Sequence, residues 1–71
     1  MNYDRIYDQL MTKAKDRGEI LGYFECHHIV PKCMGGTDDV INLVHLTAAE
    51  HYLAHLLLVK MQKYKLDHNY I

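Results

Sequence analysis

The sequence predicts a small α+β domain built from a helix, two short strands and a second helix. Three observations support this: an amphipathic pattern near the N-terminus, two short apolar runs separated by a Gly-Gly loop, and a capping box before a longer apolar run. With 71 residues, 49% hydrophobic and 24% charged, the chain is expected to fold as one domain at most. A metal ion or a partner often supplements the core of so short a chain.

The first helix is predicted from about residue 3 to residue 17. Apolar side chains recur there at steps of three and four residues, while acidic and basic side chains occupy the other face. Gly18 follows at the position where a left-handed C-cap would end the helix. The apolar stripe is interpreted as core, and its members are Tyr3, Ile6, Tyr7, Leu10, Met11 and Ala14.

Two short strands are predicted in the middle of the chain. The first lies within residues 20–30 and ends at residue 28 or 29, because Pro31 cannot donate a hydrogen bond to a strand ladder. The segment 32–39 (KCMGGTDD) is rich in turn residues and is predicted to be a loop. The second strand is predicted over residues 42–46 (NLVHL), where it can pair antiparallel with the first.

The second helix is predicted to begin at Thr47 and to continue to about Tyr64. Thr47 and Glu50 match a capping box, in which each side chain bonds to the backbone of the other residue. His51 and His55 are four residues apart, so they project from the same face of this helix. Two imidazoles at this spacing can bind one metal ion.

A third imidazole is available from the first strand. His27 and its neighbour His28 stand next to each other there, and adjacent side chains on a strand point to opposite faces. A ring from the strand and two from the helix would leave coordination positions open to water and substrate. Open positions are typical of catalytic metal sites, whereas structural zinc sites are closed by four protein ligands.

These residues resemble the HNH nuclease motif, a ββα-metal finger found in homing endonucleases, restriction enzymes and bacterial DNase toxins. The string HHIVPKCMGGTDDVINLVHLTAAEHYLAH is most similar to the HNH segments of phage homing-type endonucleases. The resemblance covers about residues 23–58. It implies a small ββα-metal (HNH) finger with an added N-terminal helix, forming a single HNH nuclease domain over residues 1–71.

The resemblance also implies a role for each matching residue. His27 corresponds to the first metal ligand and His28 to the general base, a role that suits an imidazole with a pKa of about 6.5. Asn42 corresponds to the asparagine that pins the loop between the strands and holds the base in line. His51 and His55 correspond to metal ligands on the helix, although in some relatives one of the two contacts a substrate phosphate instead.

The implied activity is metal-dependent hydrolysis of DNA phosphodiester bonds. Three neutral imidazoles favour zinc or another transition metal, with magnesium or manganese as alternatives in activity. A second interpretation is a non-catalytic, metal-stabilised DNA-binding or interaction module of the same fold. A third is a bacterial toxin DNase, which would predict an acidic inhibitor partner.

DNA is the expected partner, although the net charge of −1 lacks the basic excess of many nucleic-acid binders. The apolar residues of the second helix cover more than one face, which indicates an interface. We therefore expect either a homodimer or the catalytic part of a longer protein whose DNA-recognition region is absent. No run of about 18 apolar residues occurs, so we expect no membrane span and a soluble, cytoplasmic protein.

Other polar residues receive structural interpretations. Glu25 and Glu50 are candidates to orient ligand histidines through the second ring nitrogen, although the capping role is favoured for Glu50. The two cysteines are seven residues apart and indicate neither a disulfide framework nor a four-cysteine zinc site. Cys26 and Cys33 are interpreted as buried small hydrophobic residues or incidental thiols, and His45 and His68 as incidental. Four lysines could contact DNA phosphates, although single surface lysines are more often only solvated: Lys32, Lys60, Lys63 and Lys65.

Overall fold

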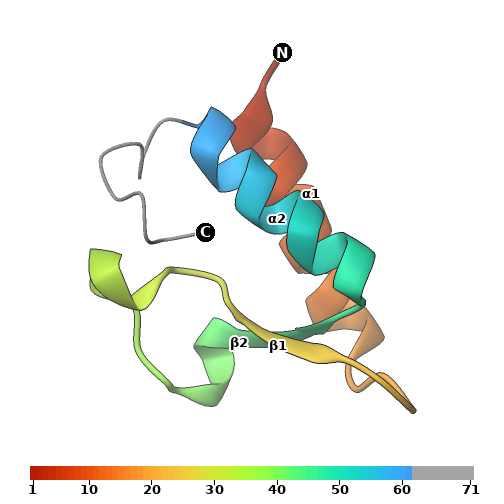
Figure 1. Cartoon of the computed structure of the whole chain (residues 1–71). Helices are drawn as coiled ribbons and strands as arrows, with labels where there is room; N and C mark the ends of the chain where they lie inside the picture. Colours follow the sequence, from red (N-terminus) through yellow and green to blue (C-terminus); the bar gives the residue numbers. More distant parts are fainter. Residues whose placement is uncertain (62–71) are drawn as a thin grey trace.

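The computed structural model describes residues 1–61 (Figure 1). These residues form α1 (Tyr3–Arg17), β1 (Glu25–His28), β2 (Leu43–Leu46) and α2 (Ala48–Lys60). Figure 1 shows the two helices packed side by side, with the start of α1 beside the end of α2 and the strands crossing the opposite end of the pair. The small α+β fold predicted from the sequence is confirmed.

Helix α1 occupies the range that its apolar periodicity predicts. The side chain of Asn2 caps its start by accepting a hydrogen bond of 3.0 Å from the backbone of Arg5. Gly18 ends it with a φ of 77° and donates its N–H to the carbonyl of Ala14 over 3.1 Å. The buried side chains of α1 are Tyr7, Met11 and Ala14.

The two strands pair antiparallel, with His27 opposite Val44 and His28 opposite Leu43. The prediction that the second strand begins at Asn42 is wrong by one residue. Asn42 is instead the last residue of a short 3₁₀ helix, Val40–Asn42, and its backbone N–H bonds to the carbonyl of Asp39 over 2.8 Å. This turn directs the amide side chain of Asn42 into the loop.

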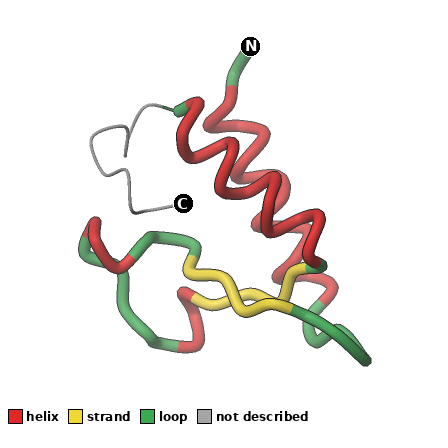
Figure 2. Tube along the Cα trace, viewed as in Figure 1, coloured by secondary structure: helices red, strands yellow, loops and turns green. Residues whose placement is uncertain are grey.

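The connection between the strands is more ordered than a plain loop. It contains the 3₁₀ helices Lys32–Met34 and Val40–Asn42, which are drawn in red in Figure 2. Gly35 follows the first of these with a φ of 90°, a left-handed conformation that favours glycine. Gly36 then donates its N–H to the carbonyl of Pro31 over 2.9 Å and closes the turn.

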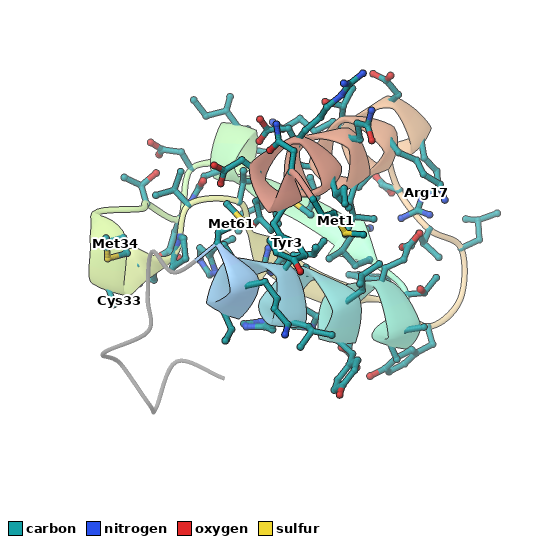
Figure 3. All side chains as sticks on the ribbon, turned by 90° about the horizontal axis from the view of Figure 1, so that it is seen from above. Met1, Tyr3, Arg17, Cys33, Met34 and Met61 are labelled. Carbon is teal, nitrogen blue, oxygen red and sulfur yellow. The ribbon has the colours of Figure 1, made fainter. Side chains whose placement is uncertain are left out.

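The predicted capping box of α2 is present. The Thr47 hydroxyl accepts from the Glu50 amide at 3.1 Å, and the Glu50 carboxylate accepts from the Thr47 amide at 2.9 Å. Arg17 donates to both carboxylate oxygens of Glu50 at 3.0 and 2.9 Å. In Figure 3 Arg17 marks the end of the molecule opposite Cys33 and Met34. The predicted extension of the helix to about residue 64 lies outside the described residues beyond residue 61.

The core lies between the two helices and the inner face of β2. Its buried hydrophobic members are Tyr7, Met11, Ala14, Val44, Leu46, Ala54, Leu57 and Leu58. Part of the apolar surface of α2 is not covered, since Tyr52, Leu53 and Leu56 are exposed. Within residues 1–61, neither helix has the length and apolar character needed to cross a membrane.

Candidate metal centre and active site

The side chains of two adjacent histidines lie on opposite faces of strand β1. His27 points into the molecule and is 2% exposed, while the side chain of His28 is 32% exposed. The alternation of side chains along a strand requires this arrangement. One imidazole therefore lines the interior, and its neighbour can reach water and a substrate.

His27 meets two histidines of α2 in what we call the histidine cluster: His27, His51 and His55. The ring centroid of His27 lies 5.2 Å from that of His51 and 5.4 Å from that of His55, and the latter two are 4.7 Å apart. One nitrogen from each ring lies within 4.8 Å of the others. The three histidines can therefore hold a metal ion, as the sequence predicts.

The neighbouring carboxylate of Glu25 fixes the orientation of His51. Glu25 Oε1 lies 2.7 Å from His51 Nδ1, and Tyr23 donates its hydroxyl to the other oxygen. The hydrogen bond from Tyr23, and to a smaller extent that from His51, lowers the pKa of Glu25. An ionised carboxylate only accepts, so His51 donates through Nδ1 and a neutral ring keeps its lone pair on Nε2. His55 Nε2 lies 3.1 Å from this atom.

A tyrosine from α1 contacts the buried histidine. The Tyr7 hydroxyl oxygen is 2.8 Å from His27 Nε2 and also donates to the carbonyl oxygen of Ile29 at 2.7 Å. The N-terminal helix therefore reaches the histidine cluster, although the sequence resemblance does not include that helix.

Burial keeps two members of the cluster in the state that binds metal. Burial, followed by repulsion from neighbouring imidazoles, lowers the pKa of His27 to about 3. The pKa of His55 is lowered mainly by burial and also by His51. Both rings are neutral near pH 7, and only a neutral imidazole offers a lone pair to an ion.

The metal-free protein is expected to lose stability as the pH falls from about 7 to about 5. The pKa of His27 is about 3 in the folded protein and about 6.5 in an unfolded chain. Between these values only the unfolded state binds the proton, so acidification favours unfolding. The stabilisation is complete above about pH 6.5 and falls by roughly 2 kcal/mol at about pH 5. Urea unfolding in EDTA at several pH values measures this change.

Replacing His27 by asparagine provides the comparison, because the amide does not titrate. We expect a shallower fall in unfolding free energy for this variant over the same window. Carboxyl groups contribute little there, since the pKa values of Glu25, Asp38 and Glu50 are all lowered from values that already lie below the window. Equal pH dependence in the two proteins would contradict the assignment to His27.

His28 is held by a carboxylate of the strand connection. Its Nε2 lies 2.8 Å from Asp38 Oδ1, and Lys32 donates to Asp38 Oδ2 at 2.9 Å. The bond to His28, followed by that to Lys32, lowers the pKa of Asp38. Because a carboxylate only accepts, His28 donates through Nε2. In a neutral ring this leaves the lone pair on Nδ1, where it can take a proton.

Asn42 ties the end of β1 to the loop. Its side-chain oxygen accepts from the Val30 amide at 2.8 Å, and its nitrogen donates to the carbonyls of Val30 and Thr37 at 3.0 and 2.8 Å. Its backbone carbonyl accepts from Ile29 at 2.8 Å. This residue is 9% exposed, and its bonds hold the chain directly after His28.

Two residues with contacts to the site are not among the candidates from the sequence. The sequence pattern places Tyr7 in the core stripe of the first helix and Asp38 in a turn. The sequence signal for Tyr7 is a tyrosine at a core position where a phenylalanine would pack equally well. A buried tyrosine hydroxyl usually has a hydrogen-bond partner, so a polar contact could have been expected there. No local signal identifies Asp38, whose partner is ten residues away.

Other residues have structural contacts. The ring of His45 stacks on Phe24 with centroids 3.7 Å apart, outside the histidine cluster. Cys26 and Cys33 are both exposed, so neither is a buried small hydrophobic residue. Glu50 caps α2 and pairs with Arg17. The hydrogen bond from Arg17 is the main cause that lowers the pKa of Glu50 to about 2. The residues from the sequence interpretation that lie outside the described range are Lys63, Lys65 and His68.

Comparison with curated proteins finds relatives in Enterobacteria phage T4. The chain is 51% identical over 65 residues to a protein named "Probable mobile endonuclease E", a match that covers 92% of this chain. It is 54% identical over 67 residues to "Probable mobile endonuclease B" and 49% identical over 65 residues to "Probable mobile endonuclease D". No family model and no solved structure matches the chain.

The matches span only part of each relative. They cover 46% of the length of endonuclease E and 25% of the lengths of endonucleases B and D. This chain therefore corresponds to one region of those proteins.

Proposed function

We propose that this chain is a metal-dependent DNA endonuclease of the HNH type, with residues 1–71 forming a single nuclease domain. The observation that carries the proposal is the histidine cluster, with His28 beside it on the opposite face of β1. The similarity to proteins named as mobile endonucleases supports it, as does the resemblance of residues 23–58 to the HNH motif.

In the proposed reaction His28 is the general base. Its Nδ1 takes a proton from a water molecule, the water oxygen attacks the phosphorus, and the 3′ oxygen leaves. Asp38 accepts the Nε2–H bond and stabilises the imidazolium that forms. Asn42 holds the backbone after His28 and so keeps the ring in line with the phosphate.

His27, His51 and His55 would hold the metal ion. A divalent ion at this cluster supplies positive charge that stabilises the phosphate and the leaving oxygen. The donor set fits such an ion, because it consists of three nitrogens, of which His51 Nε2 is oriented by Glu25. Imidazole donors favour zinc or another transition metal, and magnesium or manganese are alternatives for activity.

DNA is the proposed substrate, and the host cytoplasm is the proposed place of action. The net charge of −1 supplies little general attraction to phosphates. The matched phage proteins extend well beyond the matched region. We therefore propose that recognition of a specific DNA sequence, as distinct from cleavage itself, requires residues outside this chain, or a second copy that covers the exposed apolar side chains of α2.

Plasmid nicking in the presence and absence of divalent ions tests the proposal. We expect the wild-type protein to convert supercoiled plasmid to the nicked form with an added ion and not in EDTA. Loss of a residue that hydrogen-bonds to a metal ligand usually weakens metal binding roughly 10- to 100-fold. Replacing His51 by alanine should weaken zinc binding by more than this, because a ligand itself is lost. Calorimetric titration with zinc measures this change.

His45→Ala is the matched control, since it removes an imidazole outside the histidine cluster. It should bind zinc as the wild type does. Nicking that persists in EDTA, or in His51→Ala at the wild-type rate, would overturn the metal-dependent mechanism. Zinc binding without cleavage under any of zinc, manganese and magnesium would favour the non-catalytic module.

A further inference from the structure

Tyr7 places a hydroxyl group against a candidate metal ligand. It lies on α1, 20 residues before His27 in the sequence, and is 4% exposed. Its hydroxyl oxygen is close to two polar atoms, the Nε2 of His27 at 2.8 Å and the carbonyl oxygen of Ile29 at 2.7 Å. Both distances are those of direct hydrogen bonds.

The two contacts together determine where the protons lie. A carbonyl oxygen can only accept, so the single hydroxyl proton of Tyr7 goes to Ile29. The tyrosine oxygen must then accept at its other contact, and His27 must donate through Nε2. A neutral imidazole carries one ring proton, which leaves the lone pair of His27 on Nδ1.

We propose that Tyr7 is a positioning residue that holds His27 with its proton on Nε2 and thereby makes Nδ1 the nitrogen that binds the metal ion. The inference rests on the proposed metal site and adds to it a residue from outside the ββα motif. His51 is oriented in the opposite sense, since Glu25 accepts from its Nδ1 and leaves Nε2 for the ion. Tyr7 and Glu25 thus select different nitrogens on the two rings.

Packing alone does not explain a tyrosine at this position. A phenylalanine would fill the same buried space beside Met11 and Ala14 without a polar atom. The hydroxyl instead satisfies the His27 ring and the Ile29 carbonyl, both of which lie at the end of β1. The side chain therefore fixes the ring proton of His27 and anchors the backbone next to His28.

Long-range proton–nitrogen NMR of the histidine rings in the zinc-free protein tests the inference directly. For His27 we expect the pattern of a neutral ring with its proton on Nε2. After zinc is added, the nitrogen shift that changes most should be that of Nδ1. A proton on Nδ1 in the zinc-free wild type, or zinc on Nε2, would overturn the proposal. This measurement needs no variant and no DNA cleavage.

Tyr7→Phe removes only the hydroxyl, and Tyr3→Phe on the same helix is its matched control. We expect Tyr7→Phe to bind zinc roughly 10- to 100-fold more weakly, the usual effect of losing a partner of a ligand histidine. Tyr3→Phe should bind as the wild type does. Unchanged zinc affinity in Tyr7→Phe would contradict the positioning role. If the tautomer and the affinity behave as expected while no DNA is nicked, the proposed nuclease function fails and the inference about Tyr7 stands.

Discussion

Replacing His28 by alanine is expected to slow metal-dependent plasmid nicking by roughly 10²- to 10⁴-fold, the usual contribution of a positioned general base. Zinc binding should be unchanged, because His28 points away from the histidine cluster on β1. The fold should also be retained, since the side chain is partly exposed and contributes nothing to the hydrophobic core. Nicking rates and calorimetric zinc titration on the same preparation separate the two properties.

Asp38→Asn is an informative companion to this variant. The amide keeps the size of the side chain but removes the charge that faces His28 Nε2 and Lys32. We expect nicking to be slower than in the wild type and faster than in His28→Ala, because the base is present but less well held. Wild-type nicking by His28→Ala would exclude His28 as the base. Loss of zinc binding in that variant would instead place the ring in the metal site.

Replacing Gly36 by alanine is expected to lower the free energy of unfolding by roughly 3 kcal/mol or more, at the upper end of single substitutions. A Cβ at this position would lie 1.7 Å from the Val30 carbonyl oxygen, 2.6 Å from its carbon and 2.8 Å from the Pro31 oxygen. All three are backbone atoms, so no side-chain rotation can relieve the contact. The Val30 carbonyl must move, and it accepts the hydrogen bond from Asn42.

Gly22→Ala is the matched control for this substitution. Gly22 has a φ of 89°, but a methyl group added there would meet no atom within 4 Å, so only backbone strain of roughly 1–2 kcal/mol is expected. Urea unfolding compares the two variants. Because Asn42 and the end of β1 are disturbed only by the change at Gly36, that variant alone should also lose nicking activity. Equal destabilisation by the two substitutions would contradict this account of the loop.

Local sequence signals predict the elements and most of the histidine cluster. The stripe that contains Tyr7 and Met11 predicts the bounds of α1, and the Thr47–Glu50 pair predicts the start of α2. These signals work because helix periodicity and capping involve residues three or four apart. The residues alone suggest that His27 could join the helix histidines, and the resemblance to a known motif implies that all three bind one ion.

Contacts between distant residues are not predictable in the same way. Tyr7 and His27 are 20 residues apart. The hydrophobic pattern of α1 does not distinguish a buried tyrosine that bonds to a proposed metal ligand from one that only packs. The composition of NLVHL predicts a strand that includes Asn42. The 3₁₀ turn is favoured instead because it lets the amide bond to both Val30 and Thr37.

The position of Tyr7 on α1 has a consequence for transplanting this centre into another protein. A graft limited to residues 23–58 would carry His27, His51 and His55 but leave behind the hydroxyl that selects the nitrogen on His27. A host scaffold would have to supply an acceptor at the same place. The smallest portable unit is therefore the finger together with the helix that precedes it.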